Sequence, residues 1–245
     1  MIAIEDVHVA FGDKPVLRGV SLQVPAGCVY ALIGPGASGK SVLLKTLAGL
    51  IKPSRGSVTV AGEDVTAMND AELAEIRKRI GMLFQNYALF DYMTVGENIA
   101  FPLRRLFDLS EEEIAARVAE RLSRMALPGF EGRAVGGLSG GQKKRVGVAR
   151  ATIARAPILL YDEPTAGLDP VTSQKIYDLI REEQQNQGTT NVVISSDVGG
   201  LLTIADRVGM LHQGRLIFDG TVAEARASTI PEVHQFVHGL AEGPL

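Results

Sequence analysis

The sequence predicts an α/β fold: a parallel-sheet core, an antiparallel β subdomain before it and an α-helical subdomain inserted into it. Continuous apolar runs at residues 28–33, 80–84, 158–161 and 191–194 are typical of strands buried on both faces of a parallel sheet. Helical segments separate several of these runs, as right-handed crossover connections require. A glycine-rich loop at 34–41 follows the first run and precedes a helical pattern.

Composition limits the classes of protein that fit. The chain has 245 residues, enough for one large domain or two small ones. Its formal net charge of −3 argues against a nucleic-acid partner, which usually meets a basic face. A single cysteine, Cys28, leaves no internal disulfide. No apolar run approaches the roughly 18 residues of a membrane span, and the acidic start is unlike a signal peptide. We therefore expect a soluble, cytoplasmic chain.

The first 24 residues predict antiparallel strands with one wet face, because apolar and polar side chains alternate. The apolar positions are Ile2, Ile4, Val7, Val9, Val16, Leu22 and Val24. After the glycine-rich loop, the spacing predicts a helix over 42–50 that Pro53 stops. Short strands are expected at 208–211 and 215–218, and a last helix near 232–240.

The residues between the second and third apolar runs have little strand character and predict helices. Ser110 and Glu113 match a capping box, with serine at the N-cap and glutamate three residues later. The apolar side chains that follow share one helical face: Ile114, Val118, Leu122 and Met125. We expect one domain over 1–245, in which 1–85 and 156–220 form the core. Residues 86–155 form the helical subdomain, and 221–245 a C-terminal helix and tail.

The glycine-rich loop fits the pattern G-x-x-x-x-G-K-[ST] in the required strand–loop–helix context. It consists of Gly34, Pro35, Gly36, Ala37, Ser38, Gly39, Lys40 and Ser41. Glycines let several backbone N–H groups point at phosphate oxygens, and the helix N-terminus adds partial positive charge. The pattern therefore predicts an ATP site in which Lys40 meets the β- and γ-phosphates and Ser41 ligates Mg²⁺.

Two acidic residues end the third apolar run and complete this chemistry. Asp162 is expected to hold Mg²⁺, and Glu163 to polarise the attacking water as general base. On their own, two acids after a strand are more simply interpreted as the start of a solvated loop. Their combination with the loop at 34–41 favours the magnesium–ATP interpretation.

A further motif resembles the signature of ATP-binding cassette (ABC) ATPases, and implies their P-loop fold. It consists of Leu138, Ser139, Gly140, Gly141 and Gln142. The plainer interpretation is a serine-capped helix with exposed amides. In that family the motif binds the γ-phosphate held by a second subunit. The resemblance therefore implies a homodimer that encloses two ATP molecules.

Other positions match the same family in order. Phe11 stands where an aromatic ring stacks on adenine, although an ordinary strand-end aromatic is an alternative. Gln85 matches the glutamine that contacts Mg²⁺ and water. Asp169, which ends the string Ala-Gly-Leu-Asp, matches a residue of the dimer interface.

One position departs from the family pattern. Ser196 stands where the family places a histidine that contacts the γ-phosphate and the catalytic base. Serine has a shorter side chain and carries no extra proton. Slower hydrolysis, compensation by other groups, and a site altered to trap ATP are the three interpretations. ATP binding and dimer closure are expected to survive.

The stretch after Gln85 matches the groove where such ATPases dock beneath a membrane permease. Clustered aromatic and methionine side chains favour an interface; here they are Tyr87, Phe90, Tyr92 and Met93. Packing inside the helical subdomain is the alternative. The resemblance implies a peripheral position on the cytoplasmic face of the inner membrane.

Finer features resemble the ATPases of Mla/Mce-type phospholipid transport between inner and outer membrane. They lie at 82–103, at 204–206 and in the ending at 235–245. This resemblance implies a permease and an Mce-domain protein as partners. The alternatives are an amino-acid or other small-solute importer, a soluble ABC ATPase without a transport role, and a slowly hydrolysing regulatory subunit.

Overall fold

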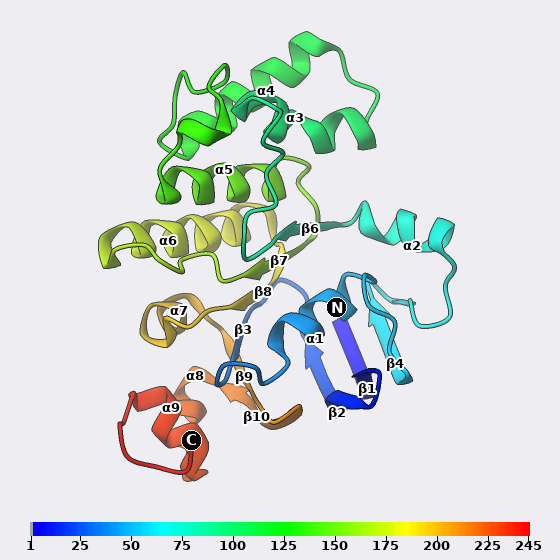
Figure 1. Cartoon of the computed structure of the whole chain (residues 1–245), viewed down its shortest axis with the longest axis vertical. Coiled ribbons are helices and arrows are strands. Elements are labelled where there is room, and N and C mark those ends of the chain that lie inside the picture. Colours follow the sequence, from blue (N-terminus) through cyan, green and yellow to red (C-terminus); the bar gives the residue numbers. More distant parts are fainter. Residues whose placement is uncertain (1) are drawn as a thin grey trace.

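The computed structural model describes residues 2–245, which form two β-sheets with helices packed around them (Figure 1). The strands are β1 (Ile2–Phe11), β2 (Lys14–Val24), β3 (Val29–Ile33), β4 (Arg55–Val60), β5 (Glu63–Asp64), β6 (Ile80–Leu83), β7 (Ile158–Asp162), β8 (Thr190–Ile194), β9 (Arg207–His212) and β10 (Arg215–Thr221). The helices are α1 (Lys40–Leu47), α2 (Asp70–Arg77), α3 (Val95–Leu106), α4 (Glu111–Arg124), α5 (Gly140–Thr152), α6 (Pro170–Gln187), α7 (Val198–Ile204), α8 (Val222–Arg226) and α9 (Pro231–His238), with a 3-10 turn at Val135–Gly137.

The smaller sheet is antiparallel, with strand order β2-β1-β4-β5, and confirms the expected N-terminal strands. Its apolar spacing changes from two to three residues between Ile4 and Val7. The register shifts at that point, and Asp6 adopts a left-handed conformation with φ of 47°. This bulge returns Val7 to the buried face, because one extra residue reverses the alternation.

The larger sheet has strand order β10-β9-β3-β8-β7-β6. All pairs from β9 to β6 are parallel, and β10 joins β9 as an antiparallel hairpin. The four strands predicted from apolar runs are present. However, β6 lies at the edge of the sheet, so Ile80 and Met82 are only half-buried. The expectation that this strand is buried on both faces is therefore wrong.

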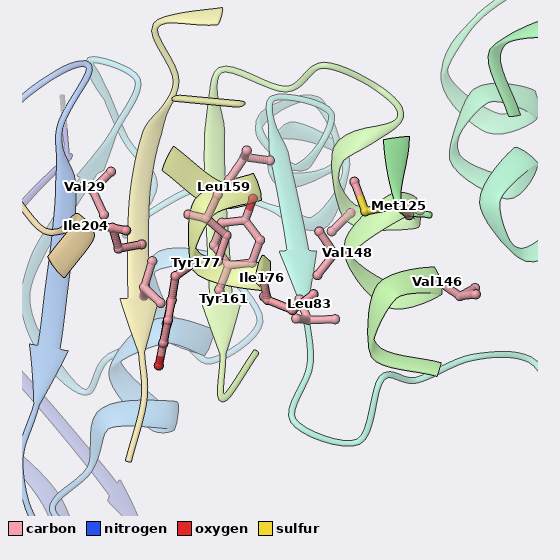
Figure 2. Packing of buried hydrophobic residues seen from close by; sticks show 14 of the residues in the cluster. Val29, Leu83, Met125, Val146, Val148, Leu159, Tyr161, Ile176, Tyr177 and Ile204 are labelled. Carbon is pink, nitrogen blue, oxygen red and sulfur yellow. The ribbon is translucent and has the colours of Figure 1, made fainter. Parts of the chain in front are cut away.

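Helices α3, α4 and α5 form the expected helical insertion, at the top of Figure 1. The predicted capping box is present, because the Ser110 hydroxyl accepts from the backbone of Glu113, whose side chain binds Ser110 in return. The insertion is not separate from the core. Figure 2 shows Leu83 of β6 beside Val148 of α5 within one buried cluster. A side chain at Gly81 would lie 2.0 Å from the Ala151 carbonyl oxygen, so glycine permits this close packing.

Three details differ from the sequence-based expectations. Helix α1 ends at Leu47 and not at residue 50, because Gly49 turns the chain with φ of 65°. Residues 55–77 contain β4, β5 and α2, for which the apolar pattern gives no strong signal. The C-terminal part contains two helices, α8 and α9, where one was expected.

The C-terminal tail folds back on α9. The buried side chain of Gln235 donates to the Leu240 carbonyl at 3.2 Å and accepts from the Leu245 N–H at 2.8 Å. Within residues 2–245, no helix is both long and apolar enough to cross a bilayer.

Candidate functional site

The glycine-rich loop joins β3 to α1 in a conformation that requires glycine at two positions. Gly34 and Gly39 have φ of 141° and 106°. A Cβ atom at Gly34 would lie 2.0 Å from the Leu211 carbonyl oxygen. At Gly39 it would lie 2.9 Å from the Leu17 side chain. The loop therefore has the backbone conformation of a phosphate-binding loop and packs closely against neighbouring residues at both glycines.

Lys40 lies folded over the start of its own loop. Its ammonium donates to the carbonyl oxygens of Gly34 at 2.7 Å and Pro35 at 2.8 Å. Burial lowers the pKa of Lys40, while the nearby charges of Glu163 and Asp162 act in the opposite direction. A half-buried cation is thus held beside the loop and close to two carboxylates.

Asp162 and Ser41 meet beneath the loop. The Ser41 hydroxyl donates to Asp162 Oδ1 at 3.1 Å. Asp162 is 2% exposed, and burial raises the pKa of its carboxyl, partly offset by the Ser41 hydrogen bond. A bound cation would compensate this desolvated carboxylate, and a carboxylate and a hydroxyl are oxygen ligands that Mg²⁺ accepts. The residues present fit a magnesium site.

Glu163 follows β7 in a left-handed conformation, with φ of 54°. Its N–H donates to the Ile194 carbonyl at 2.9 Å, which ties it to the end of β8. Its carboxylate oxygen Oε2 accepts two hydrogen bonds from Ser196, one from the backbone N–H and one from the hydroxyl, both at 3.0 Å. The structure therefore brings together the predicted base and the residue at the position of the family's histidine.

An open cleft of about 410 Å³ lies over this group. Its lining includes residues 36–42, Gln85, Glu163 and Ile194. Lys14 and Val16 of β2 also line the cleft, and sequence reasoning missed them because no motif marks them. Phe11 does not line it; this ring is 55% exposed at the end of β1.

The signature residues lie away from this cleft in the same chain, and none of Leu138 to Gln142 lines it. Ser139 caps α5: its hydroxyl accepts from the Gln142 N–H at 3.3 Å, and the Gln142 side chain accepts from the Ser139 N–H at 2.9 Å. The helix-cap interpretation is thus correct as a local description. Gly140 is exposed, with nothing within 4 Å of a Cβ placed there. The helix start is open to an approaching group.

Asp169 also caps a helix, α6, and is exposed. It accepts from the N–H of Thr172 at 3.0 Å and from the hydroxyl of Thr172 at 2.6 Å. These hydrogen bonds lower the pKa of Asp169, so the carboxylate stays charged at the surface. It lies outside the cleft lining of its own chain, like the signature residues.

In the aromatic stretch after Gln85, some side chains pack against the helices and others are exposed to solvent. The Phe90 ring lies 5.0 Å from Phe101 and 5.8 Å from Tyr92. Its backbone is held by the buried Asn98 amide, which accepts from the Phe90 N–H at 2.8 Å and donates to its carbonyl at 3.0 Å. Tyr92 is 80% exposed, while Tyr87 and Met93 are half-buried. Phe90 therefore follows the internal-packing alternative in part, and Tyr92 does not.

A cavity of about 310 Å³ opens beside this stretch, between β6, α3 and α5. Phe84, Phe90, Phe101 and Leu106 contribute apolar walls, and Arg150 contributes a charge. Arg150 donates to the carbonyl oxygens of Tyr87 at 2.5 Å and Ala88 at 2.7 Å. The left-handed turn at those two residues is thereby fixed against α5.

This fold, with its glycine-rich loop, paired acids and helical insertion, defines an ATP-binding cassette. A family model described as "ABC transporter" matches residues 17–166. The methionine import ATP-binding protein MetN of Caulobacter vibrioides is 42% identical over 91% of this chain and 68% of its own length. The phospholipid transport ATP-binding protein MlaF of Escherichia coli K12 is 35% identical over all of this chain and 91% of its own.

Solved structures agree with the family match. An ATP-binding cassette determined as a dimer with ADP and phosphate superposes with a TM-score of 0.85 and 31% identity, covering 91% of this chain and 99% of that one. The chain belongs to the ABC transporter family. It is the ATP-binding subunit of an ABC transporter, and it hydrolyses ATP in a reaction coupled to transport.

Proposed function

We propose that this subunit powers phospholipid transport of the Mla/Mce type through a separate membrane permease. The observation that carries the proposal is the alignment with MlaF, which spans the whole chain, C-terminal tail included, and 91% of that protein. The resemblance in residues 82–103 and 235–245 supports it. The subunit then works at the cytoplasmic face of the inner membrane, bound to its permease and near an Mce-domain protein.

An importer of methionine or another small solute is the second candidate. The 42% identity with MetN favours it, although that relative extends well beyond the aligned part. The two candidates differ in what the assembled transporter recognises. Purification of the complex in detergent, followed by mass spectrometry of bound proteins and lipids, distinguishes them. A permease with an Mce-domain protein and phospholipid supports the first candidate, and a solute-binding protein with methionine-stimulated ATPase activity rejects it.

We propose the following roles in the nucleotide site. The amides of residues 34–41 and the Lys40 ammonium bind the β- and γ-phosphates. Ser41, Asp162 and Gln85 would hold Mg²⁺, which would supply positive charge to the phosphates. Phe11, at the exposed end of β1, is proposed to stack on adenine once nucleotide is bound.

Glu163 is the proposed general base. Its carboxylate accepts the proton of the attacking water, and the two hydrogen bonds from Ser196 hold Oε2 in place. The Ser196 hydroxyl is donor to the base and adds no positive charge, so it orients Glu163 without the electrostatic contribution of a protonated histidine. ATP turnover continues at a reduced rate in this assignment.

The site is completed by a second copy of the chain. Residues 138–142 and Asp169 lie outside the cleft of their own chain, at open helix starts. We propose that they reach the γ-phosphate and the interface of the partner subunit in a homodimer. Glu163→Gln with MgATP should elute as a dimer in size-exclusion chromatography, and Ser139→Arg in the same background should elute as a monomer. A Glu163→Gln protein that stays monomeric with MgATP contradicts the proposal.

The permease is proposed to dock at the stretch formed by Tyr87, Phe90, Tyr92 and Met93, beside the apolar cavity. Tyr92→Ala, which removes an 80% exposed ring, should release the permease without unfolding the subunit. Phe107→Ala, another exposed aromatic on the same subdomain, is the matched control. An intact Tyr92→Ala complex contradicts the assignment of this side chain.

A further inference from the structure

Lys144 is a buried cation in α5 that the roles proposed above leave unused. It is 2% exposed, although lysine is rarely buried without a partner. Its ammonium donates to the Glu163 carbonyl oxygen at 3.3 Å and also to the Ala166 carbonyl oxygen. The Tyr87 ring lies 5.9 Å away on another side. The structure thus places an ammonium group directly on the backbone of the loop that carries the proposed base.

This loop has an unusual backbone. Glu163 adopts φ of 54°, a conformation that costs a residue with a side chain about 1 kcal/mol. In this turn the carboxylate accepts both hydrogen bonds from Ser196. Such a conformation persists only where neighbouring groups hold it. Three hydrogen bonds to the Glu163 backbone do so here. The Ile194 carbonyl accepts from the Glu163 N–H, and the Glu163 carbonyl accepts from Lys144 and from the Ala166 N–H, the latter at 3.4 Å.

The position of Lys144 on α5 adds a second connection. Ser139 of the signature motif is the N-cap of this helix, and Lys144 lies little more than one turn further on. Gly147, one turn beyond Lys144, permits close contact with β6, because a Cβ there would lie 2.7 Å from the Leu83 side chain. The helix that carries the signature is therefore tied to the catalytic loop of the same chain through one side chain.

We propose that Lys144 is a positioning residue for ATP hydrolysis, which holds the 163–166 loop so that the Glu163 carboxylate faces the attacking water. It is not among the residues that line the cleft, and it acts through the backbone of Glu163. The inference rests on the proposed role of Glu163 as base. Burial lowers the pKa of Lys144 to about 8, because the ammonium group is removed from water.

The test uses Lys144→Met, which keeps an unbranched apolar stem out to Cε and removes the ammonium donors. We expect kcat for ATP in the transporter complex to fall roughly 100-fold, as for a misplaced catalytic group, with KM for ATP within about twofold of wild type. Lys144→Arg, which keeps charged donors, should recover part of the loss. The matched control is Lys143→Met in the same helix, because Lys143 makes no side-chain hydrogen bond or ion pair within residues 2–245.

A second measurement separates positioning from general damage to α5. In the Glu163→Gln background, Lys144→Met should still form the MgATP-dependent dimer, because the signature is intact and only base orientation is lost. Loss of that dimer, or a matched fall in thermal stability and kcat, would mean a structural role and overturn the inference. Unchanged kcat in Lys144→Met also overturns it. If Glu163→Gln itself keeps wild-type turnover, the proposed base is wrong, and this outcome is distinguishable from the others.

Discussion

Ser196 gives both its backbone N–H and its hydroxyl to one oxygen, Oε2 of Glu163, at 3.0 Å each. The two residues lie 33 positions apart and meet because β7 and β8 are neighbours in the parallel sheet. A serine at this position therefore still holds the carboxylate, and one of its two hydrogen bonds comes from the backbone.

This geometry predicts a graded response at Ser196. Ser196→Ala removes the hydroxyl but keeps the N–H bond, so kcat should fall only about tenfold, as for one hydrogen bond to a charged group. Ser196→His should raise kcat if an imidazole adds charge next to the phosphate. Steady-state ATPase assays of the transporter complex, with Glu163→Gln as the inactive reference, test this. A complete loss in Ser196→Ala would contradict the shared-donor geometry.

Gly34 should be intolerant of any side chain. Gly34→Ala introduces a Cβ 2.0 Å from the Leu211 carbonyl oxygen at φ of 141°, so the free energy of unfolding should fall by at least about 3 kcal/mol. Gly36→Ala is the matched control in the same loop, because nothing lies within 4 Å of a Cβ there. Chemical denaturation measures both. Equal stability of the two variants would show that the loop relaxes freely.

The buried ion pair between Arg121 of α4 and Glu183 of α6 should hold the helical insertion to the core. Their closest atoms are 2.7 Å apart, and Arg121 also donates to the Thr152 hydroxyl at 3.1 Å. Arg121→Met leaves the buried Glu183 carboxylate with only the half-buried Arg124, 3.1 Å away, as its cation. The loss of unfolding free energy should therefore lie at the low end for a broken buried pair, about 3 kcal/mol. The double variant Arg121→Met/Glu183→Leu should recover most of the loss in urea denaturation. A double variant no more stable than Arg121→Met would contradict the cost assigned to the carboxylate left behind.

The rate at which the Cys28 thiol is alkylated should report on unfolding. Burial, with a contribution from the Asp206 charge, raises the pKa of this thiol to about 11. In the native protein near pH 8, the reactive thiolate should therefore be about 100-fold scarcer than in the unfolded chain. Alkylation followed by mass spectrometry should be slow until guanidinium chloride unfolds the protein.

The same shift has a consequence for stability. The unfolded chain releases the thiol proton above about pH 8.5, while the native protein retains it up to about pH 11. Below pH 8.5 the thiol is protonated in both states, so it leaves the free energy of unfolding unchanged. Between pH 8.5 and 11 only the unfolded chain loses the proton, so this group lowers stability as pH rises. Cys28→Ala should flatten the decline of stability in that range. An equally steep decline in Cys28→Ala would mean that other groups cause it.

Local patterns in the sequence were enough for several parts of this protein. The loop at 34–41, the capping boxes at Ser110 and Ser139 and the buried strands depend on neighbouring residues. Their conformational demands are therefore visible in short stretches of chain. A local pattern also explains why the burial of β6 was predicted wrongly. The apolar run at 80–84 indicates a strand, but its position at the sheet edge depends on which strands pair.

The relationships that make the site were decided by the tertiary structure. The order β3-β8-β7 brings the ends of three strands together. Asp162 thereby meets Ser41, and Glu163 meets Ser196. The packing of α5 then places Lys144 against the loop that follows β7, a contact for which no motif gives a signal. Contacts between residues far apart along the chain follow from sheet order and helix packing, which a sequence pattern of a few residues does not encode.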